Sequence, residues 1–185
     1  MRLILSFVLV LTVAASAQER KKIKDDDVRA ALEIHNKARE EVGVPALKLS
    51  DELAKSAQAY ADVLAKKDEG MEHSKGLGVS ENLSIFGSTS PMAVQKLLGK
   101  IGKLSAEGWY ADKAEYDRLG APKIRADGYP GQREMIGHYT AMVWRESTHV
   151  GFGAAIGKKT FRVYVVAHYS PRGNAVGEHP YKKDE

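Results

Sequence analysis

The stretch Gly137–Trp144, Gly-His-Tyr-Thr-Ala-Met-Val-Trp, combines a candidate metal ligand with a run of apolar side chains. His138 is the candidate ligand, because a neutral imidazole binds divalent metals. Large apolar residues follow it, and side chains such as those of Met142 and Trp144 are usually buried in a core. The stretch therefore predicts a short amphipathic segment that packs against a core and fixes the position of His138.

The chain carries further motifs on both sides of this stretch. They are Glu33-Ile-His35-Asn36-Lys-Ala-Arg39, Val44-Pro45-Ala-Leu47-Lys-Leu49, His73-Ser74, Glu81-Asn82-Leu83, Trp109-Tyr110 and Tyr164-Val-Val-Ala-His-Tyr-Ser-Pro171-Arg-Gly173-Asn174. Together with Gly137–Trp144 they resemble, in the same order, signatures of the CAP family. This family includes cysteine-rich secretory proteins, insect venom antigens and plant group 1 pathogenesis-related proteins. The matches extend from about Val28 to Gly177, so the resemblance covers nearly the whole chain after its N-terminal segment.

Apolar residues at helical spacing predict helices before and after the central motifs. A first helix is expected from Asp27, as its N-cap, to about Val42. Ser50 is expected to cap a second helix, and Pro91 to begin a third helical region that reaches about Asp117. Glycines weaken this last span, so we expect a break within it.

Two segments near the C-terminus predict strands. Val150–Ile156 and Phe161–Tyr169 are rich in β-branched and aromatic residues and flank a short turn, which is typical of an antiparallel hairpin. Asn82–Phe86 is the candidate third strand, and the irregular stretch Leu119–Ile136 is expected to border a cleft. Helices around a small sheet indicate the α+β class. The family resemblance implies, more specifically, an α-β-α sandwich with a central three-stranded antiparallel sheet.

The N-terminal residues have the pattern of a secretory signal peptide. Leu3–Val13 is almost wholly apolar, and Ala15-Ser16-Ala17 is a small-residue cleavage site. We therefore expect a secreted, extracellular protein that begins at Gln18 and has no transmembrane anchor after cleavage, with an uncleaved anchor as the alternative. The expected segments are a signal peptide at 1–17, a charged linker at 18–26, a single CAP (SCP) domain at 27–180 and a polar C-terminal tail at 181–185.

The chain contains no cysteine. This excludes thiol catalysis and zinc–thiolate sites, and it separates the chain from most of the family, which usually has several disulfides. Small exported domains often need disulfides, so their absence argues mildly against export. A chain of this length can nevertheless bury a sufficient core without them. The resemblance therefore identifies a cysteine-free member of the family.

The formal net charge of +4 arises from interspersed acidic and basic residues. A nucleic-acid-binding protein would normally show a basic stripe or a recognition motif, so we predict no nucleic-acid partner. The basic run Arg20-Lys21-Lys22 is followed by Asp25-Asp26-Asp27, and the two charges largely offset each other. We interpret this segment as a solvated linker, with weak contact to anionic lipid as the alternative.

Four residues that are distant in sequence form the candidate site: His73, Glu81, Asp112 and His138. Their spacing alone gives no reason for them to meet, and without the resemblance they are two separate histidines and two surface acids. Members of the family place two histidines and two acidic residues in a central cleft, so the resemblance assigns all four to one site. Asp112 stands where glutamate is typical. Glu115, one helical turn later, is a possible substitute, and we favour Asp112.

Two neutral imidazoles with open positions suit zinc or another divalent cation. In this hypothesis His73 and His138 bind the ion, while Glu81 and Asp112 orient water or bridge to the ion through it. Such a site can activate water for hydrolysis. The sequence identifies no substrate pocket, oxyanion donor or nucleophile, and it contains neither H-E-x-x-H nor G-x-S-x-G. A cleft that binds without catalysis is therefore favoured over an enzyme.

Three functions stay open on the resemblance. The first is a secreted module that binds a sterol or other lipid, or a protein partner. The second is a non-catalytic defence or host-interaction factor that acts through its surface. The third is a metal-assisted hydrolase, in particular a protease. We favour the first, and the sequence identifies no individual ligand.

Two further residues receive structural interpretations. His35 lies on the apolar face of the first predicted helix, so we expect a core histidine with satisfied ring nitrogens and not a ligand. Asn82-Leu83-Ser84 matches a glycosylation sequon. Its predicted position in a strand indicates that it becomes inaccessible after folding.

Overall fold

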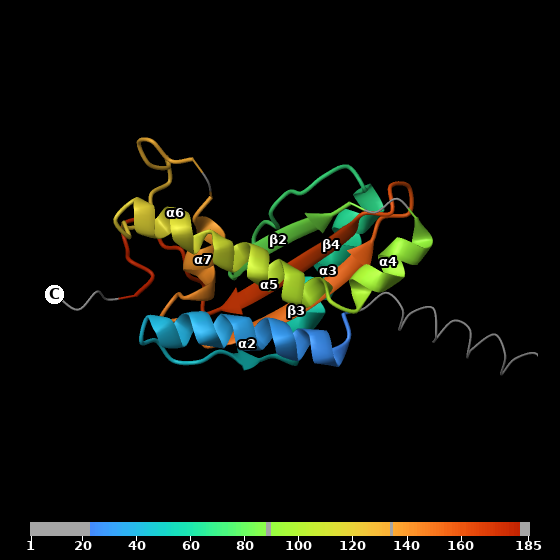
Figure 1. The fold of residues 1–185 in the computed structure, drawn as a ribbon, viewed down its shortest axis with the longest axis horizontal. Coiled ribbons are helices and arrows are strands. Elements are labelled where there is room, and N and C mark those ends of the chain that lie inside the picture. Colours follow the sequence, from blue (N-terminus) through green and yellow to red (C-terminus); the bar gives the residue numbers. More distant parts are fainter. Residues whose placement is uncertain (1–22, 88–89, 134, 182–185) are drawn as a thin grey trace, which may run out of the picture.

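The computed structural model describes residues 23–87, 90–133 and 135–181 (Figure 1). The predicted signal peptide, the cleavage point before Gln18 and most of the predicted linker lie outside the described residues. Among the described residues, no helix has both the length and the apolar composition that a bilayer crossing requires. The elements in chain order are α2 (Asp25–Glu41), β1 (Lys48–Leu49), α3 (Asp51–Lys67), β2 (Ser80–Phe86), α4 (Pro91–Leu98), α5 (Ile101–Ala111), α6 (Lys113–Arg118), α7 (Gly137–Met142), β3 (His149–Ile156) and β4 (Val163–Ser170).

The strands form one sheet in the order β1-β3-β4-β2. β2, β3 and β4 are the three antiparallel strands expected from the sequence, with Ala167 of β4 opposite both Phe152 of β3 and Asn82 of β2. The sheet differs from the expectation at one edge, where β1 adds a fourth strand that is parallel to β3. β1 has only two residues, and both are exposed, so no alternating apolar pattern marks it in the sequence.

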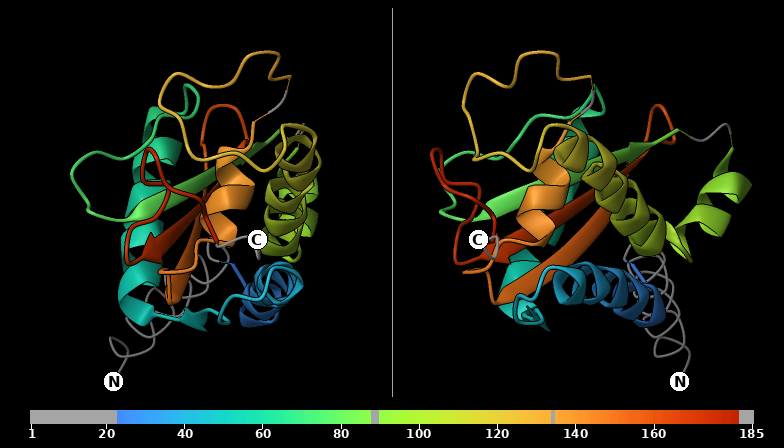
Figure 2. Two further views of the ribbon diagram at one scale, coloured as in Figure 1. Left: turned by 90° about the vertical axis from the view of Figure 1, so that its left-hand side faces the viewer. Right: turned by 60° about the vertical axis from the view of Figure 1, so that its left-hand side comes forward.

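Helices cover both faces of the sheet (Figures 1 and 2). α3 lies against one face, where it contacts β3 and β4. α2, α5 and α7 lie together on the opposite face, and α5 contacts both of the others. The α-β-α sandwich implied by the family resemblance is therefore confirmed.

Two glycines of β3 allow α3 to pack closely on the sheet. A Cβ atom added at Gly151 would lie 2.1 Å from the backbone nitrogen of Ala54, and one added at Gly153 would lie 2.3 Å from that of Gln58. Alternate residues of a strand face the same side, so both glycines face α3. Any side chain at either position would therefore push the helix away from the sheet.

The N-terminal helix begins at Asp25, earlier than the expected N-cap Asp27. The carboxylate of Asp27 instead accepts hydrogen bonds from the backbone N–H groups of Gly102 (2.7 Å) and Lys103 (2.9 Å), at the start of α5. A short acidic side chain satisfies free helical N–H groups wherever it reaches them, so Asp27 joins α2 to α5. The expected break in the third helical region is confirmed, because α4 ends at Leu98 with Gly99 as its C-cap, and α5 and α6 follow as separate helices.

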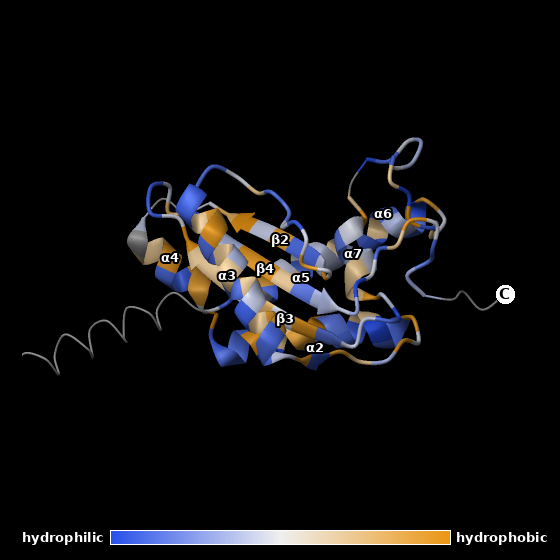
Figure 3. Ribbon diagram, turned by 180° about the vertical axis from the view of Figure 1, so that it is seen from behind, coloured by the Kyte–Doolittle hydropathy of each residue, from blue (hydrophilic) through white to orange (hydrophobic). Residues whose placement is uncertain are grey.

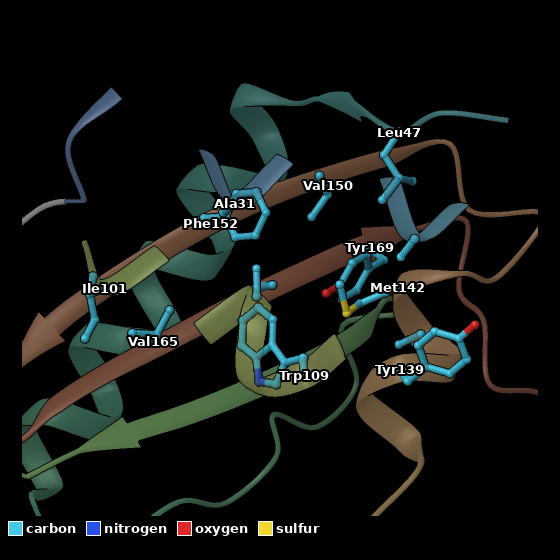
Figure 4. Close-up of a cluster of buried hydrophobic side chains, with 14 of the residues drawn as sticks. Ala31, Leu47, Ile101, Trp109, Tyr139, Met142, Val150, Phe152, Val165 and Tyr169 are labelled. Carbon is cyan, nitrogen blue, oxygen red and sulfur yellow. The ribbon is translucent and has the colours of Figure 1, made fainter. Parts of the chain in front are cut away.

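Large side chains fill the core between the sheet and α2, α5 and α7 (Figure 4). Trp109 of α5 is 2% exposed, and its Nε1 donates to the carbonyl oxygen of Leu83 in β2 at 3.0 Å. Met142 and Trp144 are also buried. Gly173 packs directly on Trp144, since an added Cβ would lie 2.4 Å from the indole Cγ. The apolar residues of the signature stretch therefore pack into the core, as the sequence predicts.

Candidate metal-binding cleft

A buried arginine of α2 holds the C-terminal end of α7, the helix that carries His138. Arg39 is fully buried, and its guanidinium donates to backbone carbonyl oxygens around the end of this helix and in the loop after α2. The acceptors are Pro45, Met142, Trp144, Arg145 and Ser147. Burial lowers the pKa of Arg39 to about 10, so the group is still charged at neutral pH. The carbonyls at a helix C-terminus carry partial negative charge, and the arginine both satisfies and fixes them.

A series of buried hydrogen bonds connects α2, β4 and β2 beneath α7. His35 Nδ1 lies 2.7 Å from the carbonyl oxygen of Ala31, which can only accept, so Nδ1 carries the proton. His35 Nε2 therefore accepts from the hydroxyl of Tyr169 at 2.9 Å. Asn82 Nδ2 donates to that hydroxyl oxygen and to the carbonyl oxygen of His138, both at 3.0 Å. His35 is thus the satisfied core histidine that the sequence predicts, and Asn82 ties β2 to the backbone of His138.

His138 pairs with Asp112. Its Nδ1 lies 3.0 Å from Oδ2 of Asp112, and both side chains are largely buried. Asp112 stands at the junction of α5 and α6, one helical turn after Trp109, whose ring centroid lies 6.4 Å from that of the imidazole. A carboxylate oxygen accepts hydrogen bonds, so Nδ1 of His138 donates to Asp112, and in the neutral imidazole Nε2 is then the nitrogen with a lone pair.

His73 pairs with Glu81 of β2 in the same way. Its Nδ1 lies 2.7 Å from Oε1 of Glu81, and the backbone N–H of Ser74 donates to the same oxygen at 3.0 Å. The hydrogen bond with Glu81 raises the pKa of His73 above its ordinary value. The side chain of His73 is 61% exposed, whereas that of Glu81 is 6% exposed. Glu81 therefore holds an accessible imidazole by its Nδ1 atom and leaves Nε2 for a ligand.

His168 is a second histidine that contacts Glu81, and it was not predicted as a site residue from the sequence. It lies opposite Glu81 in the β2–β4 pairing, with Nε2 2.9 Å from Oε2 of Glu81 and Nδ1 3.1 Å from Oγ of Ser56. Burial alone would raise the pKa of Glu81, but the hydrogen bonds that it accepts, first from His168 and then from His73, lower this pKa to about 2. Both ring nitrogens of His168 have partners, so its role is to hold Glu81 in place.

A pocket of about 330 Å³ opens beside His138. Asp112 and residues 83–86 of β2 line it. Met71 and Met135 also line it, and these side chains are 48% and 56% exposed. Met135 belongs to the irregular stretch Leu119–Ile136, which was expected to border a cleft, and through Met135 this stretch borders the pocket. Most of the lining residues are apolar, but polar and apolar atoms contribute about equally to the surface of the pocket, so it can take a nonpolar group only next to polar atoms such as those of the imidazole.

The structure arranges the four predicted site residues as two pairs, and of the four only Asp112 and His138 line the pocket. His73 contacts Glu81, and His138 contacts Asp112. Asn82, the neighbour of Glu81 in β2, donates to the backbone carbonyl oxygen of His138. Within the part of the chain that the structure describes, no group of three or more histidine or acidic side chains is arranged to hold a metal ion. A site at this cleft would therefore depend on the two histidines, and their joint binding of one ion stays a prediction.

Glu115 lies apart from both pairs. Its side chain is 6% exposed, and its carboxylate accepts from Nε and Nη2 of Arg118 at 2.7 and 2.6 Å. It also accepts from the backbone N–H of Arg133 at 2.7 Å, which fixes α6 to the following loop. Asp112, and not Glu115, is the acid that contacts His138.

The donor atoms of this cleft suit a divalent metal. Histidine ligands usually donate their second ring N–H to a carboxylate, which fixes the tautomer and raises the basicity of the ligating nitrogen. His73 and His138 both have this arrangement. Two imidazole nitrogens leave further coordination positions for water or a ligand, as in open zinc sites. The chemistry of these donor atoms therefore suits a divalent metal, with Glu81 behind His73 and Asp112 behind His138.

The sequon Asn82-Leu83-Ser84 is inaccessible in the folded chain. Asn82 is 1% exposed, and its amide nitrogen is engaged in the two hydrogen bonds described above. Attachment of a glycan would break both bonds, so glycosylation of the folded protein at Asn82 is incompatible with this structure.

Comparison with known proteins identifies the family. A family model described as "CAP: Cysteine-rich secretory protein family" matches residues 32–169. The chain belongs to the CAP family. This CAP protein is 33% identical to pathogenesis-related protein 1A of Nicotiana tabacum over 179 residues, which are 97% of this chain and 92% of the tobacco protein. It is also 33% identical to Golgi-associated plant pathogenesis-related protein 1 of Homo sapiens over 150 residues, or 80% and 84% of the two chains.

Solved structures share the fold of this CAP protein. NaASP2, crystallised with Zn²⁺, has a TM-score of 0.67 and 22% identity, and the match covers 88% of each chain. Na-ASP-1 has a TM-score of 0.70 and 20% identity, and the match covers 86% of this chain and 42% of the other. These likenesses establish the fold. This CAP protein is a cysteine-free relative of pathogenesis-related proteins.

Proposed function

We propose that this CAP protein binds one divalent metal ion, Zn²⁺ or a similar cation, through Nε2 of His73 and Nε2 of His138. The observation that carries the proposal is the matching geometry of the two pairs, in which a carboxylate engages Nδ1 of each imidazole. Glu81 and Asp112 orient the ligands and any water on the ion. A protein with the same fold has been crystallised with Zn²⁺, which supports this choice of metal.

The metal-bearing cleft serves binding and not catalysis in this proposal. Of the described residues that line the pocket beside His138, only His138 and Asp112 are ionisable, and both belong to one pair. The remaining lining is largely apolar and suits a sterol, another lipid or an apolar side chain of a protein partner. We place this binding outside the cell and in a defence context, because the protein is related to pathogenesis-related proteins and its N-terminus has the pattern of a signal peptide.

Calorimetric titration of the metal-free chain 18–185 with zinc tests the metal site. We expect one ion per chain in the parent and no binding at this site in the variant His73→Ala/His138→Ala. The matched control is His149→Ala/His179→Ala, which removes two other exposed histidines and should bind as the parent does. Binding should weaken as the pH falls, because each ligand must be neutral.

Two outcomes separate the parts of the proposal. Equal zinc affinity in the parent and in His73→Ala/His138→Ala would refute the metal site. Glu81→Gln and Asp112→Asn should each weaken binding by about 10- to 100-fold, which is the usual effect of removing a partner behind a histidine ligand. If Glu115→Gln weakens binding and Asp112→Asn does not, the acid behind His138 is wrongly assigned.

Export is tested by expressing residues 1–185 in a secretory host and sequencing the N-terminus of the protein recovered from the medium. We expect it to begin at Gln18, because Ala15-Ser16-Ala17 is the cleavage pattern. Recovery of an intact chain that begins at Met1 would contradict this.

A further inference from the structure

A groove of about 510 Å³ lies along the outer edge of β3, between the start of α2 and one face of α3, and is here named the edge groove. Figure 3 shows β3 with α3 on one side and α2 on the other. β1 covers this edge only at His149 and Val150, because the chain leaves the sheet at Ser50 to begin α3. One side of the sandwich is therefore open along most of β3.

The edge of β3 directs main-chain groups into this groove. The carbonyl oxygen of Val150 accepts from the N–H of Ser50 at 3.0 Å. The backbone of Ala154 exchanges two hydrogen bonds with the side-chain amide of Gln58, at 2.8 and 3.2 Å. Alternate residues of a strand direct their main-chain groups to the same side, so Phe152, between these two, also directs its N–H and C=O at the groove. Among the described residues, none forms a hydrogen bond with these two groups across the edge.

Carboxylates give the edge groove a negative charge. Asp25, Asp51 and Asp62 line it and are exposed. Lys55 is the basic side chain among the described lining residues, so three negative charges and one positive charge give −2. None of the three carboxylates forms an ion pair with a described residue, although Asp62 accepts a hydrogen bond from Gln58 at 3.2 Å. The groove therefore suits an extended segment with excess positive charge.

Such a segment directly precedes the groove in the chain. Ile23 is 8% exposed and lines the groove, and the residues before it are Gln18-Glu-Arg-Lys-Lys22. Three basic side chains and one acidic side chain give this segment a charge of +2. Five extended residues span about 17 Å. Asp51 and Asp62 lie about 17 Å apart along the axis of α3, at the helical rise per residue. The length, charge and attachment point of the segment therefore match the groove.

We propose that residues 18–22 lie in the edge groove as an added edge strand once the signal peptide has been removed. The main chain of the segment pairs with the N–H and C=O of Phe152, and its basic side chains lie beside Asp51 and Asp62. An uncovered strand edge can pair with other chains, and a segment that covers it prevents such pairing. This role replaces the solvated linker expected from the sequence. The proposal is independent of the metal-binding cleft.

Paramagnetic broadening in ¹⁵N NMR spectra of the chain 18–185 tests the position of the segment. The chain has no cysteine, so Gln18→Cys provides a single site for a nitroxide label. We expect the label to broaden the amide resonances of Ala54, Gln58 and Phe152, and to do so less at high salt, because exposed charges are then screened. The same sample with a reduced nitroxide is the reference. Broadening confined to the start of α2 would refute the proposal.

The first variant removes the basic charge of the segment. In Arg20→Gln/Lys21→Gln/Lys22→Gln the broadening should decrease, and the amide of Phe152 should exchange with solvent about tenfold faster, since several weak surface ion pairs together shift an equilibrium by about that factor. The same broadening in this variant and in the parent would show that covalent attachment alone keeps the label near the groove. Unchanged exchange at Phe152 would refute the main-chain pairing.

The second variant removes the charge of the groove. Asp51→Asn/Asp62→Asn should reproduce both effects of the triple variant. Its matched control is Glu33→Gln/Glu40→Gln, which removes two exposed carboxylates from α2 outside the groove and should behave as the parent does. Equal effects of the two double variants would overturn the proposal in favour of net charge.

The control for the triple variant is Lys123→Gln/Lys158→Gln/Lys159→Gln, which removes the same charge from three exposed lysines outside the groove. It should keep the broadening and the slow exchange of Phe152.

A mixture of chains distinguishes the segment of the same chain from that of a second copy. The nitroxide is attached to ¹⁴N chains, and spectra are measured on ¹⁵N chains that carry no nitroxide. We expect no broadening at the groove in this mixture. Broadening of the amide of Phe152 would assign the segment in the groove to a second copy and overturn the proposal.

Discussion

Histidine has opposite roles in two regions of the molecule, the buried hydrogen-bond series beneath α7 and the two histidine–carboxylate pairs. Beneath α7, His35 has both ring nitrogens satisfied, by Ala31 and Tyr169, and it is fully buried. His73 and His138 each have Nδ1 engaged by a carboxylate, and among the described residues no hydrogen-bond partner contacts Nε2 of either ring.

This difference shows how the fold separates structure from binding. Burial lowers the pKa of His35 to about 4, so this residue stays neutral and serves the core. The hydrogen bond with Glu81 raises the pKa of His73, whose side chain is exposed to solvent. The account therefore predicts that changes beneath α7 alter stability, while changes in the cleft alter binding.

Arg39→Met should produce the largest loss of stability. The variant keeps the apolar stem but leaves the carbonyl oxygens of Met142, Trp144 and Ser147, among others, without their buried donor. Leaving a buried carbonyl oxygen without a donor costs about 1–3 kcal/mol of unfolding free energy, and several are left here, so we expect a total loss of about 3 kcal/mol, measured by urea denaturation. Arg39→Lys should lower the unfolding free energy as well, but by less than Arg39→Met, because an ammonium group cannot reproduce the planar set of N–H donors of the guanidinium. A loss below about 1 kcal/mol in Arg39→Met would contradict the anchoring role.

The stability of the protein should fall as the pH is lowered from about 6.5, owing to His35. The folded-state pKa of this residue is about 4, below the ordinary value of 6.5, so in this range the unfolded chain binds a proton that the folded chain does not. The unfolding free energy should therefore drop by about 2 kcal/mol between about pH 6.5 and pH 5, measured by urea denaturation. The raised pKa of His73 acts in the opposite sense and at higher pH, where its contribution to stability is lost as the pH rises.

The control for this pH dependence is His35→Phe. It should be less stable than the parent at neutral pH, because Ala31 and Tyr169 lose their partner, but its stability should change much less over the same pH range. The same slope in the parent and in this variant would show that another group is responsible.

Gly151→Ala should cost about 3 kcal/mol, because its Cβ would lie 2.1 Å from the backbone of Ala54 and α3 would have to shift. The matched variant is Gly108→Ala in α5, beside the cleft, where an added Cβ has no atom within 4 Å. It should stabilise the protein by about 1 kcal/mol through helix propensity. Thermal unfolding compares the two. Similar effects of the same sign would contradict the close packing of α3 on β3.

Much of the fold could be predicted from the sequence because its determinants are local. The β-rich run Val150–Ile156, the cap at Ser50 and the helix start at Pro91 act within a few residues, and the helices and main strands appear where these signals place them. Asp27 shows the limit of this reasoning. It has the chemistry of an N-cap, but the helix that it caps begins far along the chain at α5, so its partner depends on tertiary packing.

The candidate site could be predicted only in part. The residues of the two pairs were found through the family resemblance, since Asp112 and His138 meet only after α5 and α7 pack together. His168 was missed because its contact with Glu81 depends on the register of β2 against β4. The alternation of Tyr164, Val166 and His168 on one strand face was the available signal, but it does not specify which residue lies opposite. The choice between Asp112 and Glu115 could not be made from the sequence either, because it depends on Arg118 engaging the carboxylate of Glu115 in the folded chain.

The central claim, that two histidines with engaged Nδ1 atoms bind one metal ion, is tested most directly by ¹⁵N NMR of the imidazole nitrogens during a zinc titration. The chain has six histidines, so each can be followed. At one equivalent of zinc, the account predicts that the Nε2 resonances of His73 and His138 shift together while the other imidazoles keep their positions. A shift of only one of these two, or of an exposed histidine such as His149 or His179 instead, would contradict it.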